Sequence, residues 1–383
     1  MPATYGFLST YPPTQCGLAT FNAALATHLN AGSLGCGVVR LLAGAAAGGL
    51  PLDRNAPRVV HTWRTDKPGG WAAATTALNR FDVAIVQHEY GIYPGDAGQE
   101  VLPVLQGLKV PAIVVLHTVL SNPDPLQRSV LERIVARADA VVTMTDTARQ
   151  RLIACYRVEP RKIAVIPHGA ASHTSAPRDR RDRPHLLTWG LLGPGKGIEW
   201  ALRALALLQD SEPMPTYTVA GRTHPNVLAQ HGDAYRDSLQ ALAAKLGVAD
   251  SVIWDDVYHD QAALSRLIRS ADVVVLPYDS TEQVTSGVLI EAVGANVPVV
   301  ATEFPHAVEL LADGPGLLVP HQDPEAMAAA IRHLIAAPNM AGFSGLAGGP
   351  TLRWPAVAAR YQALAFRLLA DRAPVVAGAK LPA

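Results

Sequence analysis

The sequence predicts an α/β protein with two doubly wound parallel sheets. Short β-rich runs alternate with Ala/Leu-rich helical stretches along the chain, an order typical of parallel strands joined by crossover helices. The strand candidates are apolar without polar alternation, as strands buried on both faces require. With 49% hydrophobic and 17% charged residues the chain is not intrinsically disordered, and its 383 residues suit two tandem domains of ~150 to 190 residues.

The first half, assigned to a domain at 1–170, contains strand-like apolar runs separated by helical stretches. Its helices are expected where apolar residues recur at helical spacing after a Thr or Asp. The predicted strands lie at 5–9, 38–42, 83–87, 112–116, 140–144 and 163–166, and the predicted helices at 20–29 and 125–136.

Residues 168–184, HGAASHTSAPRDRRDRP, contain few large apolar residues and are interpreted as a connector, with the linker proper at 171–184. The strand and helix pattern then restarts in a domain at 185–350, and a closing helix is expected within 351–383, after a Gly-rich gap. The predicted strands here are 186–189, 216–220, 252–254, 273–277 and 299–301, and the helices are 198–208, 234–246, 262–270, 287–294, 324–336 and 354–369.

Charge and cysteine content narrow the partners and the compartment. Lys plus Arg equals Asp plus Glu at 32 each, which argues against a nucleic-acid partner. The first 170 residues carry an excess of four positive charges, which would suit an anionic lipid surface, but no basic amphipathic helix supports membrane association. Three irregularly spaced cysteines and an N-terminus without a secretory pattern indicate a cytoplasmic location.

Polar residues at the carboxyl ends of the first-half strands are candidates for binding. A Pro-rich loop ends at Gly17 before a helix, where backbone could approach a phosphate, although a glycine needed only for its backbone angle is the alternative. His88 with Glu89, and His117, follow two neighbouring strands. His88 and Glu89 are assigned to the acceptor side or to a buried hydrogen-bonded pair, and His168 to a hinge or a ligand contact.

The second half offers cations and hydroxyl residues at equivalent positions. WGLLGPGKG places Lys196 in a Gly-rich turn suited to a diphosphate, and it is neither a Walker loop nor a dinucleotide fingerprint. Arg222 ends the next strand as a second cation or a plain surface arginine. Residues Thr285, Ser286 and Gly287 begin a helix whose N–H groups suit a phosphate, and Glu291 could accept two ribose hydroxyls.

With these segments the chain resembles the GT-B glycosyltransferases of family 4, which are retaining enzymes that use nucleotide-activated sugars. VLIEAVGANVPVV at 288–300 resembles the family's "LLEAMAxGxPVV", and the Gly17 loop and the turn at Lys196 resemble its other motifs. Residues 354–361 resemble the family's closing helix, which crosses back to the first domain. Among family members, the resemblance is greatest to bacterial proteins with CGLATF, QHEYGI, LHTVL, IPHG and QVTSG segments.

The resemblance implies two Rossmann-like domains facing a central cleft, with the donor nucleotide in the second domain and the acceptor in the first. Glu291 corresponds to the ribose-binding glutamate, Lys196 to the diphosphate lysine, Gly17 to the phosphate loop and His117 to the histidine near the transferred sugar. Two positions depart from the family. Leu191 stands where an arginine is usual, so Arg222 could supply that cation. The first glutamate of the family's pair falls on Gln283, with Glu282 one place earlier, so either side chain could reach the sugar.

The expected function is retaining transfer of a hexose, of the mannose or glucose type, from a nucleoside diphosphate sugar to a carbohydrate or other acceptor hydroxyl. The donor, such as GDP-mannose or UDP-glucose, is a substrate, and no metal or other cofactor is expected. The alternatives are a sugar phosphorylase on the same fold, a nucleotide-sugar epimerase, and a catalytically silent nucleotide-sugar-binding protein. The residues leave the base, the sugar, the acceptor and the oligomeric state open.

Overall fold

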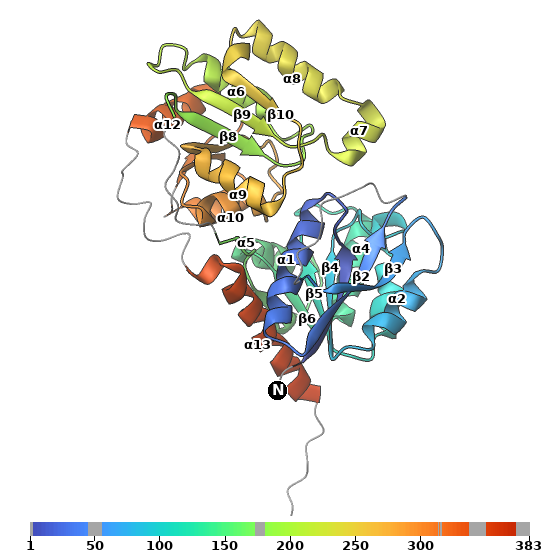
Figure 1. The fold of residues 1–383 in the computed structure, drawn as a ribbon. Coiled ribbons are helices and arrows are strands. Elements are labelled where there is room, and N and C mark those ends of the chain that lie inside the picture. The colour runs from blue at the N-terminus through green and yellow to red at the C-terminus, as the bar shows by residue number, and fades with distance from the viewer. Residues whose placement is uncertain are drawn as a thin grey trace, which may run out of the picture.

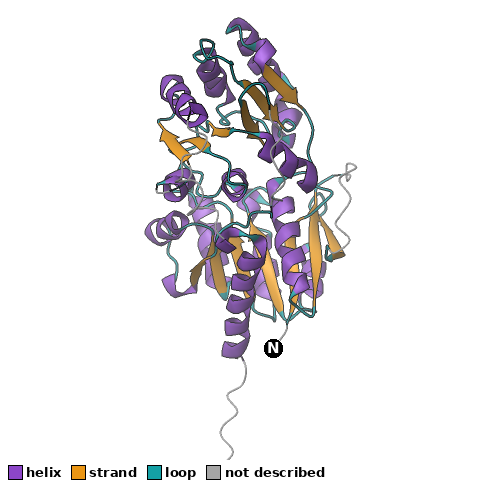
Figure 2. Cartoon of the chain, turned by 60° about the vertical axis from the view of Figure 1, so that its left-hand side comes forward, coloured by secondary structure: helices purple, strands orange, loops and turns teal. Residues whose placement is uncertain are grey.

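A computed structural model describes residues 3–44, 56–172, 181–312, 314, 316–336 and 350–372. Two parallel sheets, each covered by helices on both faces, make up the described chain (Figures 1 and 2). The prediction of an α/β fold with two doubly wound domains is therefore confirmed. No helix in these ranges is long and apolar enough to cross a membrane.

The N-terminal domain is built on a sheet with strand order β3-β2-β1-β4-β5-β6-β7. One face packs against α2, α3, α4 and α5 and the other against α1 and α13. Its strands are β1 (Thr4–Thr10), β2 (Gly35–Leu42), β3 (Arg58–Arg64), β4 (Val83–His88), β5 (Ala112–Leu116), β6 (Ala140–Thr143) and β7 (Ile163–Val165). Its helices are α1 (Gly17–Ala31), α2 (Trp71–Leu78), α3 (Val101–Gly107), α4 (Pro125–Arg137), α5 (Asp146–Cys155) and α13 (Trp354–Arg372).

The C-terminal domain is built on a sheet with strand order β10-β9-β8-β11-β12-β13. Helices α6, α8 and α12 cover one face, and α9, α10 and α11 cover the other. Its strands are β8 (His185–Trp189), β9 (Thr216–Ala220), β10 (Val252–Asp255), β11 (Val273–Leu276), β12 (Val299–Thr302) and β13 (Gly316–Val319). Its helices are α6 (Ile198–Ala206), α7 (Pro225–His231), α8 (Ala234–Lys245), α9 (Gln261–Ser270), α10 (Gly287–Gly294), α11 (Pro305–Leu311) and α12 (Pro324–Ala336).

The strand order of each sheet reverses beside its first strand, β1 or β8, and ligands of doubly wound sheets bind at the carboxyl ends beside such a switch point. Loops from these edges touch across the two domains. Thr20 Oγ1 lies 3.0 Å from Tyr258 Oη, and Thr145 Oγ1 donates to the Val284 carbonyl at 3.0 Å. The two carboxyl edges therefore face one another, and we call the space between them the interdomain region.

The chain crosses between the domains twice, and the two crossings are hydrogen-bonded to each other. The amide of Ala170 donates to the Leu352 carbonyl at 2.7 Å, and the amide of Trp354 donates back to the Ala170 carbonyl at 3.2 Å. After this pairing α13 runs along α1 and buries Tyr361 and Ala365 in the N-terminal domain (Figure 1). Within the linker prediction residues 173–180 lie outside the described ranges, as do residues 337–349 around the Gly-rich gap.

Several elements of the structure were not predicted. Strand β3 alternates exposed and covered residues because it lies at the sheet edge, so it lacks the continuous apolar run of its neighbours. Helix α5 is rich in charged residues and buries only Ala148 and Leu152, which hides its periodicity. The other elements without a prediction are α2, α3, α7, α11 and β13.

Candidate functional site

Helix α1 points its N-terminus into the interdomain region. Its N-cap is Cys16, whose sulfur accepts the Ala19 amide at 3.4 Å. A Cβ placed on Gly17 would meet no described atom within 4 Å, and the backbone of Gly17 does not adopt a positive φ. The fold therefore does not require glycine at this position. The open space beside a helix N-terminus suits the close approach of an anion.

His117 follows β5 at the same edge. Its Nε2 lies 2.8 Å from the Gln87 Oε1 and therefore donates to it, which leaves Nδ1 as an acceptor. The Phe21 ring packs edge-on against the imidazole at a centroid distance of 4.8 Å. Burial, together with the nearby His168 and His88, lowers the pKa of His117 to about 3. His117 is therefore a neutral hydrogen-bonding group.

His88 and Glu89 do not hydrogen-bond to each other. Both ring nitrogens of the fully buried His88 lack a partner in the described part of the chain, and burial lowers its pKa to about 4. The Glu89 carboxylate accepts Thr118 Oγ1 at 2.5 Å and the Tyr90 amide at 3.0 Å. Burial nevertheless raises the pKa of Glu89. Of the two residues predicted for the acceptor side, His88 is thus a buried imidazole, and Glu89 is a carboxylate that is hydrogen-bonded to Thr118 and Tyr90.

The turn between β8 and α6 holds Lys196 at the edge of the C-terminal domain. Gly197, the N-cap of α6, has φ of 65°, and a Cβ there would lie 1.7 Å from the Pro277 carbonyl oxygen, so only glycine fits. The ammonium of Lys196 lies 4.4 Å from the ring centroid of Tyr278. Burial lowers the pKa of Lys196, and no carboxylate of the described residues pairs with it. A desolvated cation without a counter-ion is suited to an anionic ligand.

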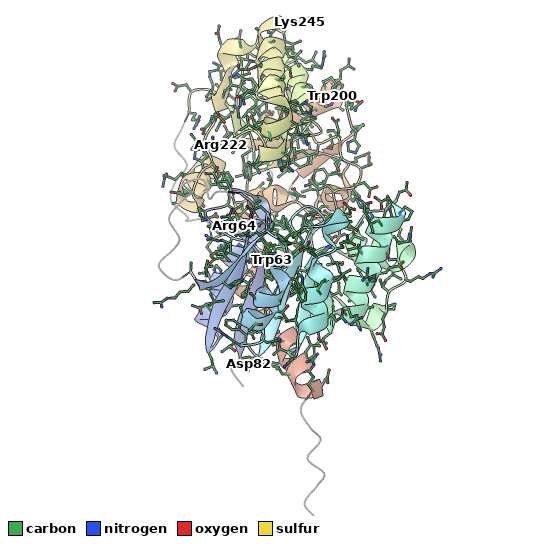
Figure 3. The ribbon with its side chains drawn as sticks, turned by 90° about the vertical axis from the view of Figure 1, so that its right-hand side faces the viewer. Trp63, Arg64, Asp82, Trp200, Arg222 and Lys245 are labelled. Carbon is green, nitrogen blue, oxygen red and sulfur yellow. The ribbon has the colours of Figure 1, made fainter. Side chains whose placement is uncertain are left out.

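Arg222 lies on the side of the C-terminal domain that faces the N-terminal domain (Figure 3). Its Nη1 donates to the Gln15 Oε1 at 3.4 Å, in the loop that leads to α1. Two residues on, His224 has its pKa lowered by burial and by the charge of Lys196. His224 was not predicted, although it follows β9 in the same loop as Arg222. Leu191 brings no charge to this region.

The N-terminus of α10 presents backbone donors. The Ser286 side chain caps the helix by accepting the Leu289 amide at 3.2 Å, and the Ser286 amide donates to His306 Nδ1 at 2.7 Å. Gly287 and the next residue, at the first turn, have no intrahelical acceptor for their N–H groups. The Thr285 hydroxyl is buried and has no hydrogen-bond partner among the described residues. That Thr285, Ser286 and Gly287 bind a phosphate stays a prediction.

Glu291 and His168 connect α10 to the crossing segment. Both carboxylate oxygens of Glu291 accept the Ala171 amide, at 3.3 and 3.2 Å. The His168 ring packs against both Phe21 and Trp354, and its Nε2 would be 2.9 Å from a Cβ on Gly287. The structure therefore places His168 both at the crossing between the domains and beside the start of α10.

The two candidates for the first glutamate position lie in different surroundings. The Glu282 carboxylate is bound by the N-terminal domain: Arg151 Nη1 donates to Oε2 at 2.8 Å, and the Ser121 amide donates to Oε2 at 2.9 Å. Gln283 remains at the C-terminal domain, where its Nε2 donates to the Thr285 carbonyl at 3.1 Å. That either side chain reaches a sugar stays a prediction. The Arg151 contact was missed because nothing in the local pattern links residues 131 positions apart.

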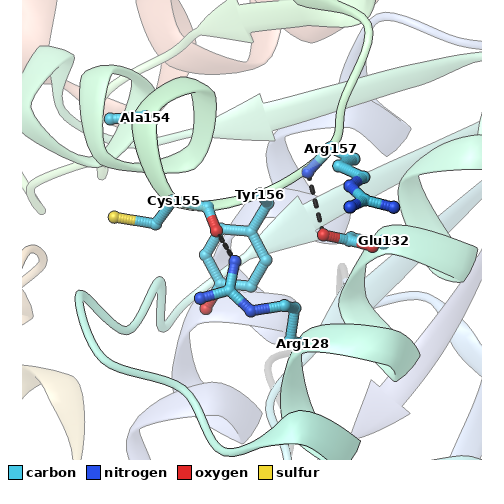
Figure 4. Close-up of a pocket in the computed structure, with 6 residues that line it drawn as sticks. All are labelled: Arg128, Glu132, Ala154, Cys155, Tyr156 and Arg157. Atoms are coloured by element: carbon cyan, nitrogen blue, oxygen red, sulfur yellow. Dashed lines mark hydrogen bonds between the residues drawn. The ribbon is translucent and has the colours of Figure 1, made fainter.

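A separate pocket of about 520 Å³ lies on the N-terminal domain and contains none of the predicted residues (Figure 4). Arg128 lies over the Tyr156 ring at 5.5 Å and donates to the Cys155 carbonyl. The Arg157 amide donates to Glu132 Oε1 at 2.9 Å. These polar groups bind one another, so the pocket adds nothing to the interdomain cluster.

Comparison with known proteins places both halves of the chain in related families. Residues 17–172 match the family described as Glycosyltransferase Family 4, and residues 183–337 match the family described as Glycosyl transferases group 1. The D-inositol 3-phosphate glycosyltransferase of Segniliparus rotundus is 31% identical over 252 residues, which cover 62% of this chain and 54% of the relative. The protein of the same name from Kineococcus radiotolerans is 28% identical over 309 residues, covering 71% and 69%. This chain thus spans about half the length of the Segniliparus relative.

Solved structures share the fold. Anabaena Alr3699/HepE in complex with UDP and glucose aligns with a TM-score of 0.65 at 16% identity, covering 96% of this chain and 95% of that one. A glycosyltransferase from Rickettsia africae aligns with a TM-score of 0.73 at 14% identity, covering 96% and 99%. Both alignments extend over nearly the whole of this chain.

Proposed function

We propose that this chain, which belongs to the group 1 glycosyl transferases of family 4, transfers a hexose from a nucleoside diphosphate sugar to an acceptor hydroxyl with retention at the anomeric carbon. The observation that carries this proposal is the convergence of an unpaired, desolvated Lys196 with the N-termini of α1 and α10. A diphosphate offers the negative charge that such a set of donors lacks.

In the proposed reaction the bond between the anomeric carbon and the diphosphate oxygen breaks, and negative charge develops on the leaving group. Lys196, Arg222 and the amides at the start of α10 would stabilise that charge, because they are already oriented before the reaction. The leaving diphosphate takes the proton of the acceptor hydroxyl, which bonds to the same face of the sugar. No carboxylate nucleophile is required in this scheme.

The remaining residues would bind and orient. Glu291 is placed to accept the ribose hydroxyls in competition with the Ala171 amide. His117, neutral and with a free Nδ1 lone pair, would accept a hydroxyl of the sugar or of the acceptor. Contact between the two domains would exclude water, which otherwise hydrolyses the donor.

The named relatives suggest which substrates to test first. Alr3699/HepE is described in complex with UDP and glucose, and the curated relatives are named for D-inositol 3-phosphate. We therefore propose UDP-glucose and GDP-mannose as first donors, of the glucose and mannose type. Inositol 3-phosphate, simple hexoses and lipid-linked hydroxyls form the first acceptor set.

The test begins with thermal stabilisation by UDP, GDP, ADP and TDP and continues with transfer from the matching nucleotide sugars. A ligand at 100 times its dissociation constant adds roughly 2.7 kcal/mol to stability. We expect selective stabilisation by one nucleotide and loss of turnover in Lys196→Ala, with Lys245→Ala, exposed at the end of α8 (Figure 3), as the control. Stabilisation by none of them would contradict the proposal. Phosphate-dependent release of a sugar phosphate would identify a phosphorylase instead.

A further inference from the structure

We propose that Arg151 is a positioning residue that holds the donor loop, residues 280–284, in its sugar-binding arrangement by way of Glu282. Arg151 belongs to the N-terminal domain and the loop to the C-terminal domain, so affinity for the donor sugar would depend on a residue that does not touch the donor. This inference rests on the proposed function. Of the two candidates for contacting the sugar, Glu282 and Gln283, it gives Glu282 the role of joining the two domains.

The Glu282 carboxylate is fully engaged with the N-terminal domain. Oε2 accepts Arg151 Nη1 at 2.8 Å and the Ser121 amide at 2.9 Å, while Oε1 accepts the Ser121 hydroxyl. Partial burial acts to raise the pKa of Glu282, but the bonds from Ser121 and the charge of Arg151 outweigh it and lower the pKa. The carboxylate is therefore charged at neutral pH, and both of its oxygens already accept hydrogen bonds from the N-terminal domain.

Arg151 joins three segments through a single nitrogen. Besides the carboxylate, its Nη1 lies 3.0 Å from the Val119 carbonyl oxygen and 3.0 Å from the Glu282 carbonyl oxygen, so its two hydrogens are shared among these acceptors. Its side chain is only 12% exposed, whereas that of Glu282 is 41% exposed. Solvent screening weakens an ion pair of this kind, so the effect we expect is on the geometry of the loop rather than on global stability.

Two further contacts hold the same elements together. Thr145 Oγ1, at the N-cap of α5, donates to the Val284 carbonyl at 3.0 Å. The Glu309 carboxylate of α11 accepts the amides of Asp146 and Thr147 at 2.8 Å each, at the start of the helix that carries Arg151. Helix α5 is thus fixed against the C-terminal domain at its first turn, and Arg151 reaches the donor loop from there.

These contacts determine the position of Gln283, because its neighbours on both sides are hydrogen-bonded to the N-terminal domain. Its carbonyl accepts the His306 amide at 3.2 Å, and its side chain donates to Thr285. Its Oε1 is therefore directed by the shape of the loop. Lys196 and Glu291, in contrast, are held by α6 and α10 of the C-terminal domain itself, so binding of the nucleotide should not need Arg151.

The test compares nucleotide and nucleotide-sugar affinities in Arg151→Met and Glu282→Gln. Arg149→Met is the matched control, since Arg149 lies on the same helix, is 38% exposed and makes only a 3.9 Å contact with Asp146. Dissociation constants are measured for UDP and UDP-glucose and for GDP and GDP-mannose. Hydrogen exchange of residues 280–284 is measured without ligand, and unfolding curves establish that each variant is folded.

We expect both test variants to bind the nucleoside diphosphate as tightly as the wild type does. The nucleotide sugar binds more tightly than the nucleotide alone, and this gain should fall about tenfold in each variant, as is usual for residues that are energetically coupled. The donor loop should exchange faster, the double variant should lose no more than either single one, and Arg151→Lys should recover part of the effect. Equal weakening of nucleotide and nucleotide sugar, or unchanged exchange of the loop, would overturn the inference. A wild type that binds no nucleotide would instead refute the proposed function, and hydrogen exchange would still decide whether Arg151 orders the loop.

Discussion

Replacing Lys196 with methionine separates two effects of the buried cation: the folding stability it lowers and the nucleotide affinity it raises. Methionine keeps much of the length and apolar volume of the side chain while removing the charge. In the wild type the ammonium lies 4.4 Å from the Tyr278 ring centroid, and burial lowers its pKa. Below the lowered folded pKa, the folded state carries a charge that the unfolded state hydrates better, and this destabilises the fold. The variant without ligand should therefore be at least as stable as the wild type at pH 7.

The difference in stability should also depend on pH. The folded pKa of Lys196 lies below its unfolded value, so the destabilisation is fully present only at pH values below the folded pKa. It disappears as the pH rises through the folded pKa toward the unfolded one. Unfolding in urea at pH 7 and at pH 10 measures the change, and the advantage of the variant should shrink at the higher pH.

The binding of a diphosphate should change in the opposite direction. A hydrogen bond to a charged group contributes about 1.5–3 kcal/mol, so its loss weakens nucleotide binding roughly 10- to 150-fold. At a ligand concentration of 100 wild-type dissociation constants, stabilisation by the nucleotide should fall from about 2.7 to between about 1.4 and 0.3 kcal/mol. Titration calorimetry with the preferred nucleotide measures the affinity directly, with Lys245→Met as the control. An affinity within twofold of wild type would refute the assignment of Lys196 to the diphosphate.

The remaining predictions concern the helix N-terminus, acid stability and the domain contact. Gly17→Ala should leave stability within about 0.5 kcal/mol, because the Cβ meets no described atom, yet weaken nucleotide binding about tenfold by blocking the backbone; unchanged calorimetric affinity would contradict this. His88, His117 and His306 have pKa values lowered by burial to about 4, 3 and 3, so the unfolded state takes up more protons below pH 6.5. Each of these histidines should lower the free energy of unfolding by roughly 1.4 kcal/mol for every pH unit below 6.5. A melting temperature that stays constant from pH 7 to 5 would contradict these lowered pKa values. Glu309→Gln removes the charge that caps α5 from the other domain and should cost about 0.5–2 kcal/mol in urea unfolding, whereas an unchanged midpoint would show that the amides find water instead.

The fold could be predicted because its central strands are buried on both faces. Strands such as β4 and β5 are continuous apolar runs, and the helices between them follow their own periodicity. Where an element is buried on one side only, or buries few residues, its apolar pattern in the sequence is weaker. Strand β3 lies at the sheet edge, and α5 buries only Ala148 and Leu152, so neither was predicted.

For the candidate site, the sequence could indicate residues but not their partners. Residues at the carboxyl ends of parallel strands in one sheet must share an edge, which grouped Gly17 with His117 in the first sheet and Lys196 with Arg222 in the second. Pairing across the domains depends on how two sheets dock, and no local spacing encodes that geometry. The family spacing falls on Gln283, with Glu282 one place earlier as the alternative, and nothing in the sequence indicated that the Glu282 carboxylate is bound by Arg151 and Ser121.

The return of α13 to the N-terminal domain has a consequence for biosynthesis. Tyr361 and Ala365 complete the apolar layer that α1 forms on one face of the first sheet, yet they are translated after the entire C-terminal domain. On the ribosome, domains generally fold as units in the order in which they emerge. Here the domain that emerges first keeps an uncovered apolar face until α13 has emerged, so the second domain can complete its core earlier. A nascent chain halted before Trp354 would expose that face to chaperones.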